Sequence, residues 1–331
     1  MVDDKLMKDG LCDAPKIVIK ARQLPAVACR LGGADCPILG KNQARAILEV
    51  LQSDPTATIR LTSDADCAPH YTMLDDEDFR RQNREAVFNR KRDLDVLQKL
   101  GLCPGDTRRA RYLYELLFSR VETLCGICAF DTPGWEGCPY ARDGIYEDVR
   151  SRGWQAVVHA RSPEEMARAR EENVDAIFHG DRIFMRPHHI MCLACWYNGG
   201  QASGLRPNDT LAEILERVRT DPKVPVTLVE GTCMACHCCD GFDPPTGRCV
   251  HSGGLIRDYK KDLDCFQMLG MYPGDTLPAD EMFALIFERV GSTRDVCGYG
   301  TGEVTAEEWR ICNDPAGSPG YAATRKSGVF G

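Results

Sequence analysis

The chain has 331 residues, which is long for one hydrophobic core and comfortable for two domains of ordinary size. Its formal net charge of -8 argues against nucleic acid as a main partner, because phosphate binding needs clustered lysines and arginines. The longest apolar runs are too short to span a membrane, and the first residues lack the basic and apolar regions of a signal peptide. We therefore expect a cytoplasmic protein with neither a membrane nor a nucleic-acid partner.

The cysteine content is the most informative feature of the composition. Eighteen cysteines are present. Thiols in a reducing compartment are explained more readily by metal or redox chemistry than by disulfides. A disulfide framework would suit a small secreted domain with a poor core, and this chain has neither property. The composition therefore favours metal binding.

The two halves of the chain repeat each other. Residues 90–107, RKRDLDVLQKLGLCPGDT, align without gaps to residues 259–276, YKKDLDCFQMLGMYPGDT, with 11 of the 18 positions identical. An apolar pattern with helical spacing follows each copy, and an alternating strand pattern precedes each copy after an Asp-Pro pair. Each unit thus reads helix, strand, ligand loop, long helix, Pro-Gly-Asp-Thr turn, helix and ligand loop. A short strand is expected to open each unit, at 16–21 and 176–185.

These patterns predict an α+β fold made of two pseudo-symmetric, duplicated cysteine-rich units with short strands, several helices and metal-binding loops. We place the first unit at 1–139 and the second at 183–312. Residues 140–182 would form an ordered strand-helix-strand connector, with a strand at 154–160 and a helix that starts at the capping sequence Ser162-Pro163-Glu164-Glu165. Residues 313–331, rich in Gly, Ala, Pro and Ser, would be an extended C-terminal arm.

A ligand that both units need should appear in both. Four positions meet this condition, and they pair Cys29 with Cys192, Cys67 with Cys233, Cys128 with Cys297, and Cys138 with Cys312. Four thiolates per unit is the number that a cubane iron-sulfur cluster or a structural zinc ion requires. Further candidates lie in the loops CGIC at 125–128 and CMACHCC at 233–239, where Cys-x-x-Cys steps let two thiolates converge on one metal. The candidate metal ligands are Cys29, Cys67, Cys125, Cys128, Cys138, Cys192, Cys233, Cys236, Cys239, Cys249, Cys297 and Cys312.

Only the second half has a histidine pair, His188-His189, which ends three residues before Cys192. These imidazoles could ligate a metal, donate hydrogen bonds to cluster sulfur or relay protons, and they are the candidates for catalytic residues. The isolated residues His70, His237 and His251 are open to a structural role or to a ligand role.

One segment resembles a known family. RPHHIMCL at 186–193, CMAC at 233–236, DLDCFQMLGMYPGD within the repeat, and the cysteines at 249, 297 and 312 resemble the bacterial and archaeal domain of unknown function 1284, a cysteine-rich group associated with iron-sulfur clusters. The resemblance covers residues 186–312. Residues 29–138 resemble it more weakly, because they keep CGICAF and Cys138 but lack the histidine pair and the middle cysteine. The resemblance implies a tandem metal-cysteine protein and names no reaction.

Three functions remain open. The first is an iron-sulfur protein with one or more clusters per unit, of the [4Fe-4S] type, that acts in electron transfer or as a redox subunit with a redox partner protein. The second is a structural zinc protein that presents an interaction surface. The third is an iron-sulfur enzyme with a substrate site near His188 and His189. The shared cysteines are scattered singly rather than set in two Cys-x-x-Cys pairs, which favours the cluster over zinc.

Overall fold

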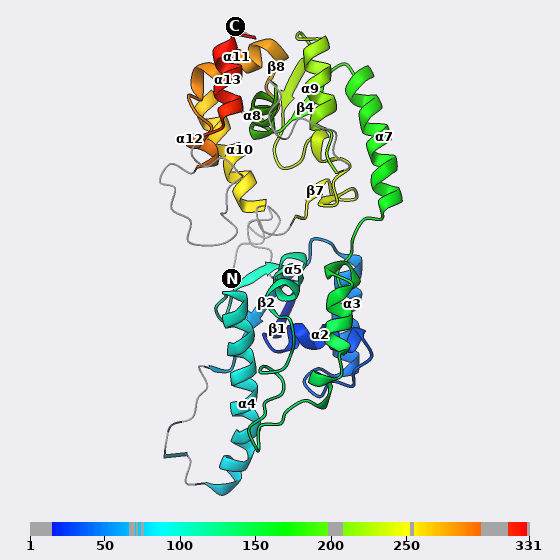
Figure 1. Ribbon diagram of the computed structural model, residues 1–331, viewed down its shortest axis with the longest axis vertical. Helices are drawn as coiled ribbons and strands as arrows, with labels where there is room; N and C mark the ends of the chain where they lie inside the picture. The colour runs from blue at the N-terminus through cyan, green and yellow to red at the C-terminus, as the bar shows by residue number, and fades with distance from the viewer. Residues whose placement is uncertain are drawn as a thin grey trace, which may run out of the picture. The chain divides into compact units, whose positions relative to one another are not determined.

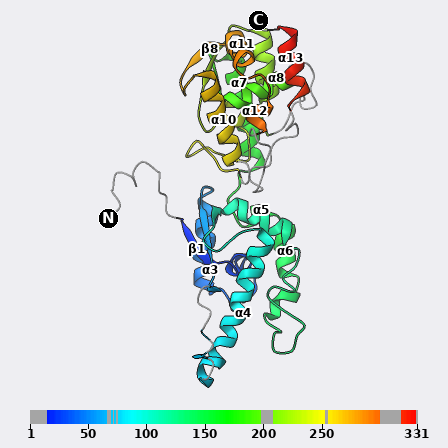
Figure 2. The ribbon, with the colours of Figure 1, turned by 90° about the vertical axis from the view of Figure 1, so that its left-hand side faces the viewer.

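The computed structural model describes residues 15–65, 70, 72–73, 76–197, 208–251, 255–298 and 317–329. The chain divides into two compact units, unit 1 at residues 1–160 and unit 2 at residues 161–331. Each unit combines helices with short strands in a small mixed sheet (Figure 1, Figure 2). The predicted α+β class is therefore confirmed.

Unit 1 contains one three-stranded sheet surrounded by helices. Its elements in chain order are β1 (Ile17–Lys20), α2 (Gln23–Leu31), α3 (Lys41–Ser53), β2 (Thr58–Thr62), α4 (Glu77–Leu100), β3 (Thr107–Arg109), α5 (Ala110–Arg120), η3 (Pro139–Arg142), α6 (Ile145–Ser151) and η4 (Trp154–Ala156). Strand β1 pairs in parallel with β2, and β2 pairs antiparallel with β3. The alternation along β1 turns Ile17 and Ile19 into the core and leaves Val18 exposed.

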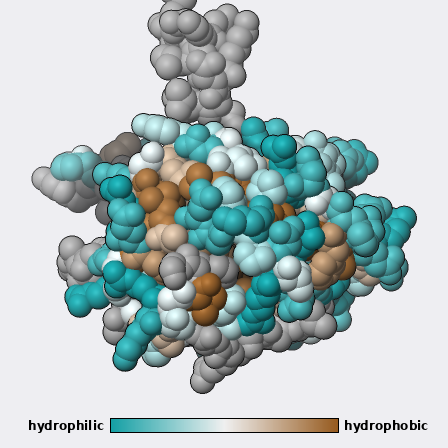
Figure 3. Space-filling view, turned by 90° about the horizontal axis from the view of Figure 1, so that it is seen from above, coloured by the Kyte–Doolittle hydropathy of each residue, from teal (hydrophilic) through white to brown (hydrophobic). Residues whose placement is uncertain are grey.

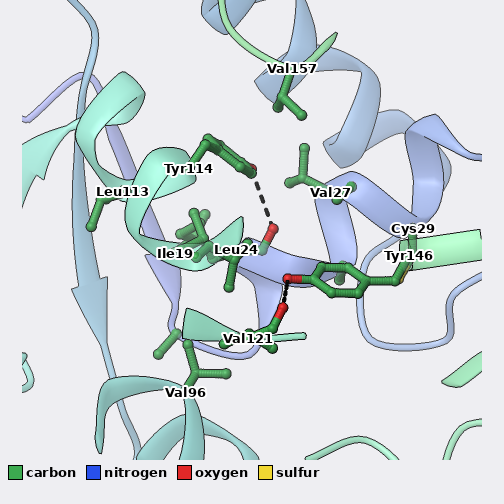
Figure 4. Close-up of a cluster of buried hydrophobic side chains, with 14 of the residues drawn as sticks. Ile19, Leu24, Val27, Cys29, Val96, Leu113, Tyr114, Val121, Tyr146 and Val157 are labelled. Carbon is green, nitrogen blue, oxygen red and sulfur yellow. Dashed lines mark hydrogen bonds between the residues drawn. The ribbon is translucent and has the colours of Figure 1, made fainter. Parts of the chain in front are cut away.

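Two buried tyrosines tie the helices of unit 1 together. The hydroxyl of Tyr114 on α5 donates to the carbonyl of Leu24 on α2 at 3.3 Å, and the hydroxyl of Tyr146 on α6 donates to the carbonyl of Val121 at 2.9 Å (Figure 4). A buried hydroxyl needs such a partner, because an unpaired polar group in a core is costly. Cys29 on α2 lies beside Tyr146 in this core (Figure 4).

Unit 2 repeats the sheet of unit 1. Its elements are α7 (Pro163–His179), β4 (Ile183–Met185), α8 (Pro187–Trp196), α9 (Leu211–Thr220), β5 (Pro225–Leu228), η5 (Met234–Cys236), β6 (Phe242–Asp243), β7 (Arg248–Cys249), α10 (Leu255–Leu269), β8 (Thr276–Pro278), α11 (Ala279–Arg289), α12 (Arg294–Cys297) and α13 (Pro319–Ser327). Strand β4 pairs in parallel with β5, and β5 pairs antiparallel with β8. The strand order and directions are therefore those of β1, β2 and β3.

The repeated segment forms equivalent elements in both units. Helices α4 and α10 end at Gly101 and Gly270, whose φ angles of 67° lie in the left-handed region that glycine adopts without strain. Each is followed by a short strand and then by α5 or α11. The expected opening strands are present as β1 and β4, although β4 covers only 183–185 of the expected 176–185, because residues 176–179 continue helix α7.

The connector differs from the sequence-based expectation at 154–160. These residues form a 3-10 turn and an irregular stretch instead of a strand. The Trp154 ring there packs under the Arg111 guanidinium at 4.1 Å, and the valines at 157 and 158 are both buried, so the apolar residues pack without a partner strand. Helix α7 does begin at the predicted capping box of Ser162 and Glu165.

The C-terminal arm is not extended throughout, because residues 319–327 form α13. Ser318 caps this helix and Pro319 occupies its first turn. The helix lies against α8 (Figure 1). A Cβ atom at Gly320 would come within 2.1 Å of the carbonyl oxygen of Cys195. The buried hydroxyl of Tyr321 donates to the carbonyl of Val290 at 2.8 Å. This arm therefore contributes to the core of unit 2.

The face in Figure 3 is mostly hydrophilic, with small separate hydrophobic patches. Among the described residues, no helix is both long enough and apolar enough to cross a membrane.

Candidate metal centre

A buried carboxylate fixes the start of α8. Arg186 Nε donates to Asp262 Oδ2 at 2.6 Å, and His188 Nδ1 lies 2.6 Å from Asp262 Oδ1. Asp262 lies on α10 and is fully buried. Arg186 precedes Pro187, which favours an extended backbone at Arg186 and a helix start at the proline. His188 is thus held in one orientation by Asp262.

His189 faces the cysteine loop that follows β5. Its Nδ1 lies 3.1 Å from Cys233 Sγ, and Cys233 Sγ lies 3.8 Å from Cys236 Sγ. These three ligand atoms lie within 4.8 Å of one another. Burial, together with the neighbouring His188 and Arg186, holds the pKa of His189 well below its usual value. The imidazole is therefore neutral and has a lone pair for a metal.

The two thiols of this loop differ in acidity. The hydrogen bond from Cys233 holds the pKa of Cys236 below its usual value, although burial opposes this, and Arg186 adds a favourable charge. Burial raises the pKa of Cys233. Arg186 Nη2 is buried without a hydrogen-bond partner in the described part of the chain. A buried N-H group of this kind is suited to a thiolate or an inorganic sulfide as its acceptor.

A cavity of about 760 Å³ within unit 2 is bordered by Arg186 and Cys236. Its walls come from α8, from the loop around η5, from β7, from α10 and from α12. The cysteines that line it are Cys192, Cys195, Cys236, Cys239, Cys249 and Cys297. Both His188 and His189 also line it. The structure therefore gathers residues from distant parts of unit 2 around one space.

The remaining thiols of unit 2 have different surroundings. Cys239 Sγ and Cys249 Sγ approach opposite nitrogens of the His251 ring, at 3.3 Å and 3.7 Å. Cys265 is buried in the core, with its Sγ 3.3 Å from the sulfur of Met191, and it behaves as a small hydrophobic residue. Cys238 is buried as well, 3.9 Å from Arg170.

Unit 1 gathers four buried thiols, those of Cys29, Cys36, Cys128 and Cys138. Burial raises the pKa of Cys29 to about 12, and Cys128 and Cys138 reinforce the shift. Cys36 and Cys138 share a hydrogen bond, which raises the pKa of Cys36 and lowers that of Cys138. The amide of Cys138 donates to the carbonyl of Cys128 at 2.8 Å, which holds these two segments together.

A buried arginine accompanies these thiols. Arg92 is 7% exposed and its charge acts on Cys128 and Cys138. It donates to the oxygens of Asn89 and Cys128, and no carboxylate pairs with it among the described residues. Its Nε is buried without a partner there. The guanidinium also lies 3.9 Å from the centroid of the Phe88 ring. A buried cation without a carboxylate partner is costly, so a negative metal-thiolate group beside it would supply the missing charge.

Other expected ligands lie apart from these sites. Cys125 is exposed, with its thiol 3.6 Å from the carbonyl of Ala141. Cys67 and Cys312 lie outside the described residues. No disulfide joins the cysteines in the described part of the chain.

Sequence reasoning missed Cys36, Arg92 and the pair of Arg186 with Asp262. Cys36 has no cysteine at the corresponding position of the second half, so the comparison of halves excluded it. The identical DLD triplets at 93–95 and 262–264 were a usable signal, because a charged residue that is kept in both copies of an amphipathic helix can be a buried contact.

Comparisons with protein-family models, curated proteins and solved structures found no match.

Proposed function

We propose that the protein is an iron-sulfur protein that holds a [4Fe-4S] cluster in the cavity of unit 2 and a second metal-thiolate group at the buried thiols of unit 1. Such clusters accept and donate single electrons. A role in electron transfer, or as a redox subunit with a protein partner, follows from that chemistry. The resemblance of residues 186–312 to domain of unknown function 1284 points to the same class of cofactor.

The observation that carries this proposal is that six cysteines line one cavity of about 760 Å³. A cubane cluster needs one thiolate on each of its four irons, so its ligands stand well apart. A single zinc ion instead needs four ligand atoms at about 2.0–2.3 Å from one point. Cys192 and Cys297 border the cavity but belong to neither described group of three ligand atoms within 4.8 Å. This spread of thiols favours the larger group.

The residues of unit 2 fit a negatively charged cluster. Together with the hydrogen bond from Cys233, the Arg186 guanidinium lowers the pKa of Cys236 through its charge and a side-chain hydrogen bond, and its buried Nη2 atom has no partner among the described residues. His189 is neutral and lies against Cys233, so it can donate a hydrogen bond to sulfur or act as a ligand. Asp262 holds both Arg186 and His188 in place. Hydrogen bonds to sulfur from such groups adjust the reduction potential of a cluster.

A single ion at His189, Cys233 and Cys236 is the second candidate. The 3.8 Å separation of the two sulfurs equals the separation expected for two thiolates on one tetrahedral zinc ion, about 3.8 Å. In that case the metal would hold the loop to α8 and the protein would serve as a structural zinc protein that presents an interaction surface.

Iron, sulfide and zinc analysis of cysteine variants distinguishes the candidates. With a cluster in the cavity, Cys192→Ser and Cys297→Ser in the anaerobically purified full chain should each lose most of the iron and sulfide of unit 2. Cys265→Ala is the matched control, because this thiol packs in the core of the same unit, and it should retain both. Zinc without sulfide in the parent protein would support the single ion instead.

A further inference from the structure

A second set of ligand atoms surrounds the imidazole of His251 in unit 2. Cys239 Sγ lies 3.3 Å from His251 Nε2, and Asp240 Oδ1 lies 3.4 Å from the same nitrogen. Asp240 Oδ1 also lies 3.4 Å from Cys239 Sγ. All three ligand atoms are within 4.8 Å of one another. They therefore converge on one point.

The distances between these three ligand atoms match those between ligand atoms that bind one metal ion. Zinc-sulfur and zinc-nitrogen bonds of about 2.3 Å and 2.0 Å at a tetrahedral angle place the sulfur and the nitrogen about 3.5 Å apart. A carboxylate oxygen and an imidazole nitrogen on the same ion are about 3.4 Å apart. The geometry points to a binding site for one divalent ion of the zinc class at Cys239, Asp240 and His251. This site is additional to the proposed cluster and does not depend on it.

The backbone is shaped around this arrangement. The amide of Gly241 donates to Cys239 Sγ at 3.3 Å, and such a bond stabilises a thiolate. A Cβ atom at Gly241 would lie 2.5 Å from the His251 ring, so only glycine lets the imidazole occupy this position. The amide of Val250 donates to the carbonyl of Gly241 at 2.7 Å, next to the pairing of β6 with β7. The hairpin thus brings His251 back to the cysteine loop.

The other ring nitrogen of His251 has its own partner. Its Nδ1 lies 3.7 Å from Cys249 Sγ. A metal-binding imidazole normally directs its second nitrogen to a neighbouring acceptor, which fixes the tautomer and the orientation of the ring. A proton on Nδ1 directed at Cys249 leaves the lone pair of Nε2 for the metal. Cys249 is therefore a positioning residue rather than a ligand.

The donor set also selects the ion. With the metal bound, one thiolate, one carboxylate and one neutral imidazole would carry two negative charges, which a divalent cation balances. Sulfur and nitrogen donors favour zinc over magnesium or calcium, which prefer oxygen ligands. Cys239, Gly241 and His251 line the cavity. Three protein ligands leave a fourth position for water or a small ligand.

Zinc titration of the full chain tests the site. The protein is stripped of metal under anaerobic, reducing conditions and titrated with Zn²⁺ in competition with a chromophoric chelator. His251→Gln and Cys239→Ser should each bind one zinc equivalent fewer than the parent. Cys249→Ser should keep this equivalent with about 10–100-fold weaker affinity, as for other residues that orient a ligand. His237→Gln is the matched control, because this imidazole packs against Phe242 at 5.2 Å, and it should match the parent.

Two results would overturn the site. The first is zinc binding by His251→Gln and Cys239→Ser that equals the parent in number and affinity. The second is loss of the same zinc equivalent in Cys192→Ser and Cys297→Ser, since one shared centre would then explain every ligand. Asp240→Asn should weaken binding while keeping a group of similar size, so it serves as a second variant if His251→Gln does not fold. Iron and sulfide contents test the cluster separately, because a protein without them can still bind this zinc.

Discussion

Arg186 and Asp262 are joined at 2.6 Å across 76 positions of the chain. Unit 1 contains the equivalent pair, in which Arg22 Nη1 lies 2.6 Å from Asp93 Oδ2. Asp93 and Asp262 occupy the same position of the repeated segment, and both are fully buried. Arg22 and Arg186 are the N-cap residues of α2 and α8. Helix α4 therefore anchors α2, and helix α10 anchors α8. Each anchored helix carries a candidate cysteine.

We expect the loss of this anchor to be costly. Asp262→Ala would leave Arg186 and His188 without their buried partner, and breaking a buried ion pair costs about 3–5 kcal/mol. The free energy of unfolding from urea titration should fall by this amount for the transition of unit 2. Asp264→Ala, two positions along α10, removes only a surface pair with Lys260 and should cost less than about 1 kcal/mol. Equal losses in the two variants would contradict the anchor.

Local sequence patterns predict some features of the two units and miss others. Apolar spacing and turn residues predicted the repeated helices and the opening strands, because these signals are local. The anchor of Asp262 and the approach of Cys36 to Cys138 depend on contacts between distant segments, which local patterns do not encode. The C-terminal helix α13 was missed for a related reason, since its composition resembles a loose tail and its packing on α8 stabilises it.

Arg92 should control metal affinity in unit 1. Its buried charge lies near the thiols and has no carboxylate partner among the described residues. Arg92→Gln should therefore weaken metal binding by unit 1 about 10–100-fold, the usual effect of removing a group that supports a metal site. Competition titration with a chelator measures the change. Arg90→Gln is the control, because Arg90 donates to Asn83 instead, and an equal loss there would argue against a specific role for Arg92.

Cys36 and Cys125 should behave oppositely when each is changed to serine. Cys36 is buried and hydrogen-bonded to Cys138, whereas Cys125 is exposed. Cys36→Ser should lower the metal content of unit 1, and Cys125→Ser should leave it nearly unchanged. Metal analysis of both purified variants tests this. The reverse result would place Cys125 among the ligands and Cys36 in a packing role.

His189 should make the metal-free protein sensitive to acid. Burial and the neighbouring His188 and Arg186 hold the pKa of His189 well below its usual value, so the folded protein binds no proton there as the pH falls through the usual value. The unfolded chain binds one below about pH 6.5, so the free energy of unfolding falls as the pH drops through that value. His189→Gln removes this proton uptake and should flatten the fall. Urea titrations over this range that give the same slope for both proteins would contradict the prediction.

The central claim, a cluster held by the thiols of unit 2, is tested most directly by the visible and electron paramagnetic resonance spectra of the anaerobically isolated full chain, before and after dithionite. The account predicts a brown protein with equal amounts of iron and sulfide, whose colour bleaches on reduction as the signal of a reduced four-iron cluster appears. A colourless protein with stoichiometric zinc, no sulfide and no signal after dithionite would contradict it.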